Sequence, residues 1–288
     1  MKIRRSGRLV DMTSYLLDHP RHLVSLSFFA DRYGAAKSSI SEDLGIIKQT
    51  FETQGMGTLS TVPGAAGGVK FIPYASEEEA RRFIGNLRMQ LAQSDRLLPG
   101  GYLYLNDILG DPRIVNKIGR LFASVFTDRK IDVVMTVATK GISIAYAVAS
   151  YLDVPVVIVR RDSKVTEGST VSINYVSGST KRIQNMVLAR RSLEEGSNVL
   201  IIDDFMKAGG TINGMVSMLE EFKATVAGIG VLVEAEDNSE DRLVDEYISL
   251  VRLSEVNVKE KHIEVEEGNY FKYTKPLKIE EYSTKEEE

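Results

Sequence analysis

The residues with the clearest chemical potential are two adjacent acids, Asp203 and Asp204, which directly follow the apolar run of residues 199–202. An uninterrupted apolar run is typical of a strand that is buried on both faces. Carboxylates at the exposed carboxyl end of such a strand can accept hydrogen bonds from neighbouring hydroxyl groups of a sugar. The pair therefore suits a vicinal diol.

A short glycine-containing loop follows the two acids and leads into a predicted helix. Its backbone amides can converge on a phosphate, and the Thr211 hydroxyl and the helix amino terminus add donors and positive potential. Each feature alone is common, because Gly-Gly often precedes a helix and paired acids are often only solvated. Their order along the chain is far more specific. The loop comprises Phe205, Met206, Lys207, Ala208, Gly209, Gly210 and Thr211, with Lys207 as a further positive charge.

A helix-turn-helix pattern lies near the N-terminus. Its first helix can be capped by Ser25 or Ser27 and ends at Gly34. Its second helix begins near Ala36 and keeps apolar residues on one face. The opposite face of its first turns carries Lys37, Ser38, Ser39, Ser41 and Glu42. Such a pair of helices is typical of DNA-binding motifs, in which the second helix reads base edges, although a small helical bundle shows the same spacing.

A hairpin and a set of basic residues accompany this pattern. Residues 58–62 and 69–73 are predicted strands around a glycine-rich turn, which indicates the wing of a winged helix domain. Lys70 on the returning strand could contact a phosphate. A helix over residues 8–17 precedes the motif. The start of the chain forms a basic arm that would attract a phosphate backbone, with Lys2, Arg4, Arg5 and Arg8.

Composition limits the classes of protein that fit. The chain has 288 residues, of which 43% are hydrophobic and 26% charged, so we expect two ordinary globular domains. It contains no cysteine and three histidines, which argues against disulfides and a structural zinc site. Acids interrupt the one stretch that resembles a signal peptide, and no segment approaches the length of a membrane span. We therefore expect a cytoplasmic protein.

The net charge of −4 conceals an uneven distribution. Residues 1–74 hold nine Lys and Arg against six Asp and Glu, whereas residues 75–288 hold 27 against 34. The basic end coincides with the helix-turn-helix pattern. Because duplex DNA is strongly anionic, this distribution favours DNA as a partner of the N-terminal part of the chain.

The remainder of the chain alternates strands and helices. A strand over residues 131–137, a helix over 142–151 and a strand over 154–159 form one βαβ unit. Residues 199–202, about 211–222 and 226–233 form a second, so the sequence predicts an α/β domain with a mainly parallel sheet. A capping box at Ser76 opens this part of the chain. We expect two domains, at residues 1–74 and 75–288.

Residues 199–212 resemble the phosphoribosyl pyrophosphate motif of type I phosphoribosyltransferases, which has four apolar residues, two acids and a loop ending in Gly-x-Thr or a close variant. The resemblance implies that Asp203 and Asp204 bind the ribose hydroxyls and that residues 205–211 surround the ribose phosphate. Thr139, Lys140 and Gly141 resemble the pyrophosphate loop of that family. With its N-terminal domain, the whole chain resembles the purine operon repressors that are built on a phosphoribosyltransferase domain.

That resemblance carries expectations about ligands and partners. It implies an operator-binding repressor of purine biosynthesis genes whose effector is phosphoribosyl pyrophosphate, which relieves repression. It also implies that guanosine tetraphosphate or pentaphosphate can occupy the same pocket. No cofactor is required, and the residues leave any need for Mg²⁺ open. Since helix-turn-helix proteins commonly read paired half-sites, we expect a homodimer.

An active purine phosphoribosyltransferase with a DNA-binding appendage is the alternative. The two acids occur in such enzymes as well. However, residues 23–261 contain no histidine, and no convincing base-recognition and acid/base constellation is visible. We therefore expect a phosphoribosyltransferase fold without catalytic residues.

Three further segments carry weaker signals. Tyr102 follows two glycines and could belong to a hood over the nucleotide pocket. Residues 162–184 are predicted to be either a loop that closes over the ligand or a mobile surface hairpin. The acidic residues from Glu264 onward are expected to form a solvated edge and a frayed end.

Overall fold

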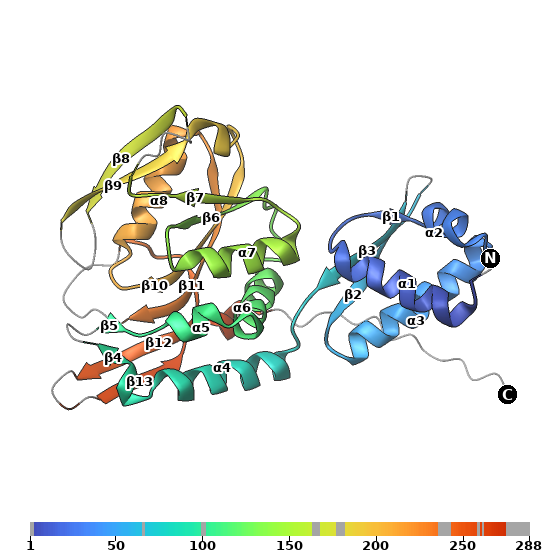
Figure 1. The fold of residues 1–288 in the computed structure, drawn as a ribbon, viewed down its shortest axis with the longest axis horizontal. Helices are drawn as coiled ribbons and strands as arrows, with labels where there is room; N and C mark the ends of the chain where they lie inside the picture. Colours follow the sequence, from blue (N-terminus) through green and yellow to red (C-terminus); the bar gives the residue numbers. More distant parts are fainter. Residues whose placement is uncertain are drawn as a thin grey trace.

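The structure, a computed structural model of the chain, is shown in Figure 1. It describes residues 3–64, 67–98, 102–162, 168–176, 182–235, 243–257, 260 and 262–274. Lys2, parts of the segment 162–184 and the end of the acidic tail lie outside these ranges.

A winged helix-turn-helix domain forms the N-terminal part, as predicted. Its apolar core joins the helices to one face of a small sheet with the strand order β1-β3-β2. Strands β2 and β3 form the expected antiparallel wing, while the two-residue strand β1 was not predicted. The elements are α1 (Arg5–Asp18), β1 (Val24–Ser25), α2 (Leu26–Tyr33), α3 (Lys37–Thr53), β2 (Gly57–Val62) and β3 (Gly68–Pro73).

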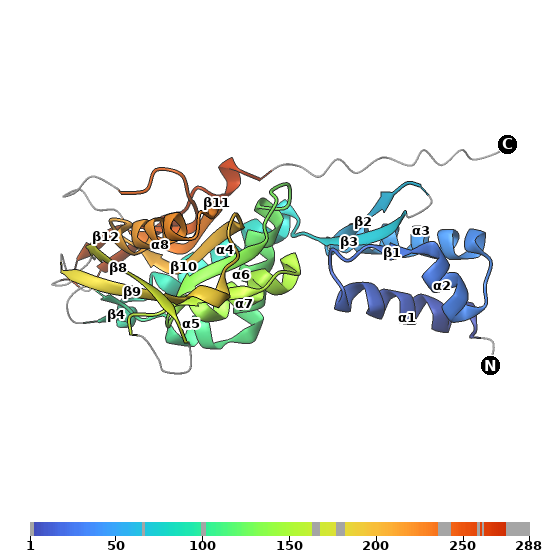
Figure 2. The ribbon, with the colours of Figure 1, turned by 90° about the horizontal axis from the view of Figure 1, so that it is seen from above.

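The second domain begins after residues 74–76 and lies beside the first (Figures 1 and 2). Its first half comprises α4 (Glu77–Leu91), β4 (Leu97–Leu98), β5 (Tyr102–Leu103), α5 (Asn106–Gly110), α6 (Pro112–Val125), β6 (Val133–Val137), α7 (Gly141–Leu152) and β7 (Val156–Val159). Its second half comprises β8 (Thr170–Val176), β9 (Ile183–Ala189), β10 (Asn198–Met206), α8 (Gly210–Glu221), β11 (Thr225–Ala235), β12 (Ile248–Asn257) and β13 (His262–Glu267).

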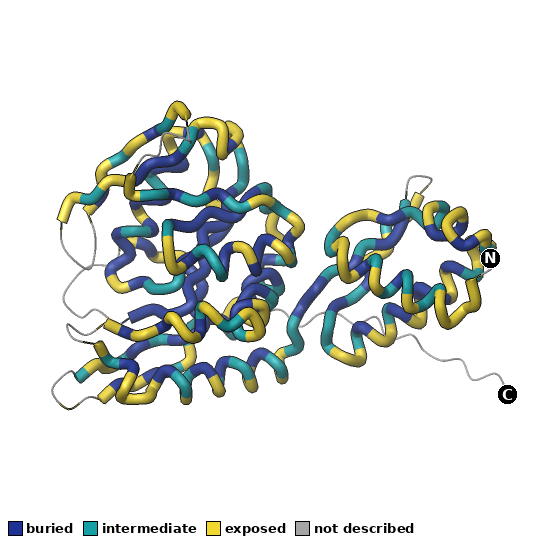
Figure 3. The backbone as a smooth tube through the Cα atoms, viewed as in Figure 1, coloured by how far each residue is buried: buried dark blue, intermediate teal, exposed yellow. Residues whose placement is uncertain are grey.

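A six-stranded sheet with the order β13-β12-β11-β10-β6-β7 organises this domain. All its pairings are parallel except that of β12 with β13, which confirms the mainly parallel α/β prediction. Helices α4, α6 and α7 pack against one face, and α8 with the β8–β9 hairpin covers the other. The central strands are therefore buried on both sides (Figure 3).

Two expectations need correction. Strand β10 continues past the two acids to Met206, because Phe205 and Met206 pair with Val233 and Glu234 of β11. The loop before α8 consequently shrinks to residues 207–209. For segment 162–184, the sequence leaves two alternatives open, and residues 170–176 and 183–184 belong to the β8–β9 hairpin, whose inward residues pack on α8.

Two ends of the chain also differ from expectation. Arg5 and Arg8 do not lie in an arm, since α1 already begins at Arg5. Part of the acidic segment forms the edge strand β13, where Ile263 and Val265 face the core. Among the helices of the described ranges, none combines the length and apolar character that a membrane span needs.

Candidate functional site

The candidate pocket lies where β6 and β10 end. These neighbouring strands are parallel, with Ile201 paired to Met135, so the segments that follow them leave the sheet at the same edge. Ligands of open α/β sheets bind at the carboxyl ends of strands. After β6 come the exposed residues Thr139 and Lys140, and the peptide bond between Ala138 and Thr139 is cis.

The two acids at the end of β10 have different environments. Asp203 is 3% exposed, and one of its carboxylate oxygens accepts the backbone N–H of Asp204 at 2.9 Å. Burial, together with the neighbouring negative charge, raises the pKa of Asp203 well above its ordinary 3.8. Burial also raises the pKa of Asp204, and the positive charge of Lys140 opposes that rise. Asp204 is the more accessible acid and is therefore better placed to meet a ligand hydroxyl.

Gly141 brings the segment after β6 into contact with β10. A Cβ atom at this position would lie 2.3 Å from the Thr136 hydroxyl oxygen and 3.1 Å from a carboxylate oxygen of Asp203. Gly141 therefore lies against Asp203, and the charge of Lys140 acts on Asp204. Thr136 was not predicted: it is fully buried, and its hydroxyl has no hydrogen-bond partner within the part of the chain that the structure describes.

Replacing Gly141 by alanine is expected to lower the melting temperature and, if the site binds the phosphoribosyl pyrophosphate that the sequence resemblance implies, to abolish that binding. The added methyl group meets Thr136 and Asp203, which are too deeply buried to move aside, and overpacking of this kind costs about 1–3 kcal/mol. Calorimetry and thermal unfolding measure the two effects. Gly110→Ala, which has open space around its Cβ position, is the control. Normal ligand affinity in Gly141→Ala would contradict the proposed packing.

The loop between β10 and α8 is short and mostly buried. Ala208, Gly209 and Gly210 are buried, whereas Lys207 is exposed. Gly209 has a φ of 82°, a conformation that favours glycine, and the Ala208 carbonyl accepts the backbone N–H of Leu243 at 3.1 Å. These contacts fix the loop in front of the helix amino terminus, where backbone amides are available to an anion.

Other predicted pocket residues take different positions. Thr211 lies half-buried in the first turn of α8. Phe205 and Met206 lie in β10, and the Met206 side chain packs into the core with α8 and β8–β9. Tyr102 lies in β5, where its side chain is 59% exposed. Phe205 and Met206 thus belong to the strand, and their backbone amides are not part of the loop that was predicted to surround a phosphate.

The candidate nucleic-acid interface is the start of α3. Lys37, Ser38 and Ser41 are exposed and Ser39 is half-buried, while Ile40 and Leu44 anchor the opposite face in the core. Two further predicted contacts lie outside this helix. Arg4 is exposed just before α1, and Lys70 lies on β3 opposite Ser60.

Arg5 and Arg8 have a structural role that the sequence analysis missed. Both donate to Asp43, which is fully buried in α3: Arg5 Nε at 2.9 Å and Arg8 Nε at 2.5 Å. These ion pairs tie α1 to the candidate recognition helix. The sequence contains a signal for this buried ion pair, because Asp43 lies among apolar residues on the inward face of α3, between Ile40 and Ile47.

Replacing Lys37 by alanine is expected to weaken operator binding by about 1–3 kcal/mol, because an exposed base- or phosphate-contacting cation is lost from the start of α3. Affinity for phosphoribosyl pyrophosphate should not change. DNA titrations at several salt concentrations measure the effect. Lys130→Ala removes the same charge from a lysine of the second domain that is 80% exposed, and it serves as the control. Unchanged DNA affinity in Lys37→Ala would reject this placement of the recognition helix.

Comparison with known proteins agrees with this two-part architecture. Residues 4–73 match the family described as bacterial purine repressor, N-terminal, and residues 105–268 match the phosphoribosyl transferase domain. The chain is 68% identical over 275 residues to the purine biosynthesis transcriptional repressor PurR of Bacillus subtilis (strain 168), covering 96% of each chain.

Two further comparisons extend this result. The purine biosynthesis transcriptional activator PurR of Lactococcus lactis subsp. lactis (strain IL1403) is 49% identical, covering 93% of this chain and 99% of the other. The adenine phosphoribosyltransferase structure from Thermoanaerobacter pseudethanolicus is 22% identical with a TM-score of 0.50, covering 58% of this chain and 98% of that one, which shows the fold alone. The chain therefore belongs to the family of bacterial purine biosynthesis transcriptional regulators that join a purine-repressor N-terminal domain to a phosphoribosyltransferase domain.

Proposed function

We propose that this protein is a repressor of purine biosynthesis genes whose affinity for operator DNA is controlled by phosphoribosyl pyrophosphate. One observation carries the proposal: Asp203 and Asp204 lie near the carboxyl end of β10, close to Lys140 and Gly141, in a chain whose other domain is a winged helix. The ribose hydroxyls meet Asp204. The phosphate groups meet the amides of residues 207–210 and the Lys140 ammonium.

The effector changes DNA affinity only through a difference in its binding to two conformations of the protein. Such a coupling is typically about 1–3 kcal/mol, equivalent to about 5- to 150-fold in affinity. In the proposed direction, phosphoribosyl pyrophosphate weakens operator binding and relieves repression. The 49% identical activator of Lactococcus lactis gives a reason to measure the sign directly.

Guanosine tetraphosphate and pentaphosphate compete for the same pocket in this proposal. Such a nucleotide carries phosphates on both sides of its ribose. It therefore presents hydroxyls or phosphates to the acids and anionic oxygens to the loop amides. Competition predicts that guanosine tetraphosphate raises the apparent dissociation constant of phosphoribosyl pyrophosphate in proportion to its own concentration.

A salt-controlled DNA titration tests the proposed function. A duplex from a purine-gene promoter is titrated with the full-length protein, with and without phosphoribosyl pyrophosphate, in the presence and absence of Mg²⁺. The expected result is weaker DNA binding with the effector. Equal affinities, in a sample where calorimetry records effector binding, would overturn the proposed control.

The alternative is an active purine phosphoribosyltransferase, which the match of residues 105–268 to the transferase domain favours. We propose that the domain binds its ligand without turnover and that the chain acts as a homodimer on paired half-sites. Pyrophosphate release with adenine, guanine, hypoxanthine and xanthine distinguishes the two functions. Turnover with any of these bases would establish the enzyme.

A further inference from the structure

One arginine of the DNA-binding domain inserts into the second domain. Arg21 lies in the turn between α1 and β1, and its Nε donates to the carbonyl of Tyr151 at 3.2 Å. Its two terminal nitrogens donate to the carbonyls of Thr127 and Ala123, at 3.5 and 3.4 Å, and to the Thr127 hydroxyl at 2.7 Å. The guanidinium therefore holds four acceptors at the C-terminal ends of α6 and α7.

The chemistry of this contact is specific. The last carbonyls of a helix lack intrahelical partners and carry the negative end of the helix dipole. A cation there is therefore stabilised both by hydrogen bonds to these carbonyls and by the helix dipole. The planar guanidinium can donate in several directions at once, which a lysine ammonium cannot match in this geometry. The fork thus ties two helices of one domain to a single turn of the other.

The turn that carries Arg21 is itself fixed to the winged helix domain. The backbone N–H of Arg21 donates to the Phe71 carbonyl of β3 at 2.7 Å. Its φ is 61°, an uncommon value for a residue other than glycine. The backbone is therefore held in a conformation that aims the side chain across the domain boundary, and a movement of the guanidinium is passed to the sheet of the wing.

Helix α7 connects this contact to the candidate effector pocket. Its first residue, Gly141, packs on Thr136 and Asp203, and its last turn contains Tyr151. The helix is about 18 Å long at 1.5 Å per residue, and it packs closely on α6 where Gly119 meets Ala147. A packed helix of this length moves as a unit, so a displacement at Gly141 appears at Tyr151.

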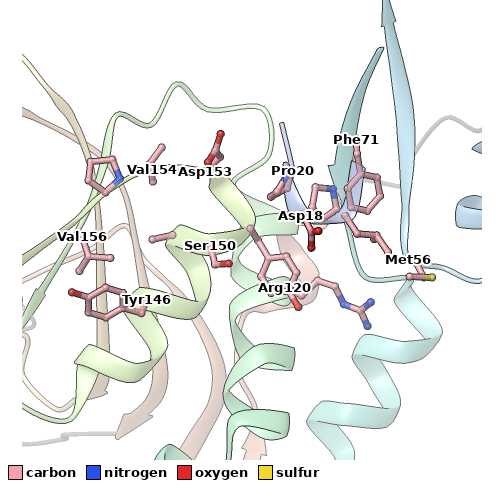
Figure 4. A pocket seen from close by; sticks show the side chains of 15 residues that line it. Asp18, Pro20, Met56, Phe71, Arg120, Tyr146, Ser150, Asp153, Val154 and Val156 are labelled. Atoms are coloured by element: carbon pink, nitrogen blue, oxygen red, sulfur yellow. The ribbon is translucent and has the colours of Figure 1, made fainter. Parts of the chain in front are cut away.

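The space around the contact permits such a movement. A cleft of about 830 Å³ separates the domains. Figure 4 shows Asp18, Pro20 and Phe71 of the winged helix domain facing Tyr146 and Ser150 of α7 across it. The connecting segment is tied to the second domain, where the Ser124 hydroxyl accepts the backbone N–H of Ala75 at 2.8 Å. Among the described residues, the two domains are thus connected by a few polar contacts, and no continuous apolar core fills the boundary.

We propose that Arg21 is the positioning residue through which ligand binding at Gly141 reorients the DNA-binding domain. Helix α7 transmits the movement from Gly141 to Arg21. This inference rests on the proposed function, in which phosphoribosyl pyrophosphate controls DNA affinity. Arg21 touches neither ligand. It sets how much a change at one site alters the other, and the two binding reactions remain when it is lost.

The test compares the ratio of DNA affinities without and with phosphoribosyl pyrophosphate in full-length variants. Arg21→Gly removes the guanidinium and suits the positive φ. Its ratio should fall to nearly one, while calorimetry without DNA gives an unchanged effector affinity. Arg21→Lys, which keeps the charge without the fork, should give an intermediate ratio. Arg32→Ala is the matched control, because Arg32 pairs with Asp11 inside the winged helix domain, and it should keep the wild-type ratio.

Two further measurements distinguish loss of the Arg21 contact from misfolding of the variant. Thr127→Val removes only the hydroxyl acceptor and should lower the ratio by a smaller factor. Hydrogen exchange should show effector-induced changes in the winged helix domain of the wild type but only in the second domain of Arg21→Gly. A wild-type ratio in Arg21→Gly, or in both Arg21→Lys and Thr127→Val, would overturn the Arg21 inference alone. A ratio of one in the wild type, despite bound effector, would overturn the proposed function and this inference with it.

Discussion

Replacing Asp204 by alanine is expected to abolish the response of DNA binding to phosphoribosyl pyrophosphate. Asp204 is the accessible acid of the pair, so its carboxylate would accept the hydrogen bonds of the ribose hydroxyls. A hydrogen bond to a charged group contributes about 1.5–3 kcal/mol, so losing two of them lowers the effector affinity by about 10²-fold or more. Calorimetry measures this loss, and a DNA titration with and without the effector measures the response.

Basal DNA binding should stay nearly intact in this variant, since Asp204 lies in the other domain from the winged helix. Asp204→Asn preserves the shape and removes the charge, so it should lose most of the affinity as well. Asp95→Ala removes an exposed acid of the same domain and should respond to the effector normally. Loss of basal DNA binding in Asp204→Ala would show that the pocket is structural.

Replacing Asp43 by alanine is expected to cause the largest loss of stability in the winged helix domain. The buried carboxylate neutralises Arg8, whose side chain is only 13% exposed, and also pairs with Arg5. Removing one partner of a buried ion pair leaves the other charge buried and unpaired, which typically lowers the free energy of unfolding by about 3–5 kcal/mol. Chemical unfolding should therefore show an early transition for this domain, and DNA affinity should fall with the lost position of α3.

Two controls separate the buried charge from a general sensitivity of the domain. Arg32→Ala breaks the pair with Asp11, in which the Arg32 side chain is 42% exposed, and should cost only about 0.2–1 kcal/mol. The double variant Asp43→Ala with Arg8→Met removes both charges and should recover much of the lost stability. A single Asp43→Ala variant with wild-type stability would show that the ion pairs do not hold α1 against α3.

The elements around the pocket could be predicted because their signals are local in sequence. The apolar run before Asp203 specified the central strand. The caps were equally readable: Ser76 accepts the backbone N–H of Glu79, and Asp111 accepts that of Arg113 just after Pro112. Each of these signals acts within a few residues, so neither the rest of the chain nor the tertiary structure is needed to interpret it.

The features that the sequence did not reveal depend on partners far along the chain. The two-residue strand β1 exists only because it pairs with β3, and β10 extends to Met206 because β11 lies beside it. Arg21 finds its acceptors 102 to 130 residues away. A lone arginine after a proline gives no sign of such a contact. The division between Asp203 and Asp204 also follows from burial, which adjacent identical residues cannot indicate.

The acceptors that hold Arg21 are peptide carbonyls and one hydroxyl, all of them electrically neutral. Dissolved salt competes strongly with protein cations for the phosphates of DNA, because binding there releases condensed counterions. A hydrogen bond to a neutral carbonyl or hydroxyl releases no condensed counterions. Rising ionic strength is therefore expected to weaken binding to the operator more than it weakens the contact between the two domains.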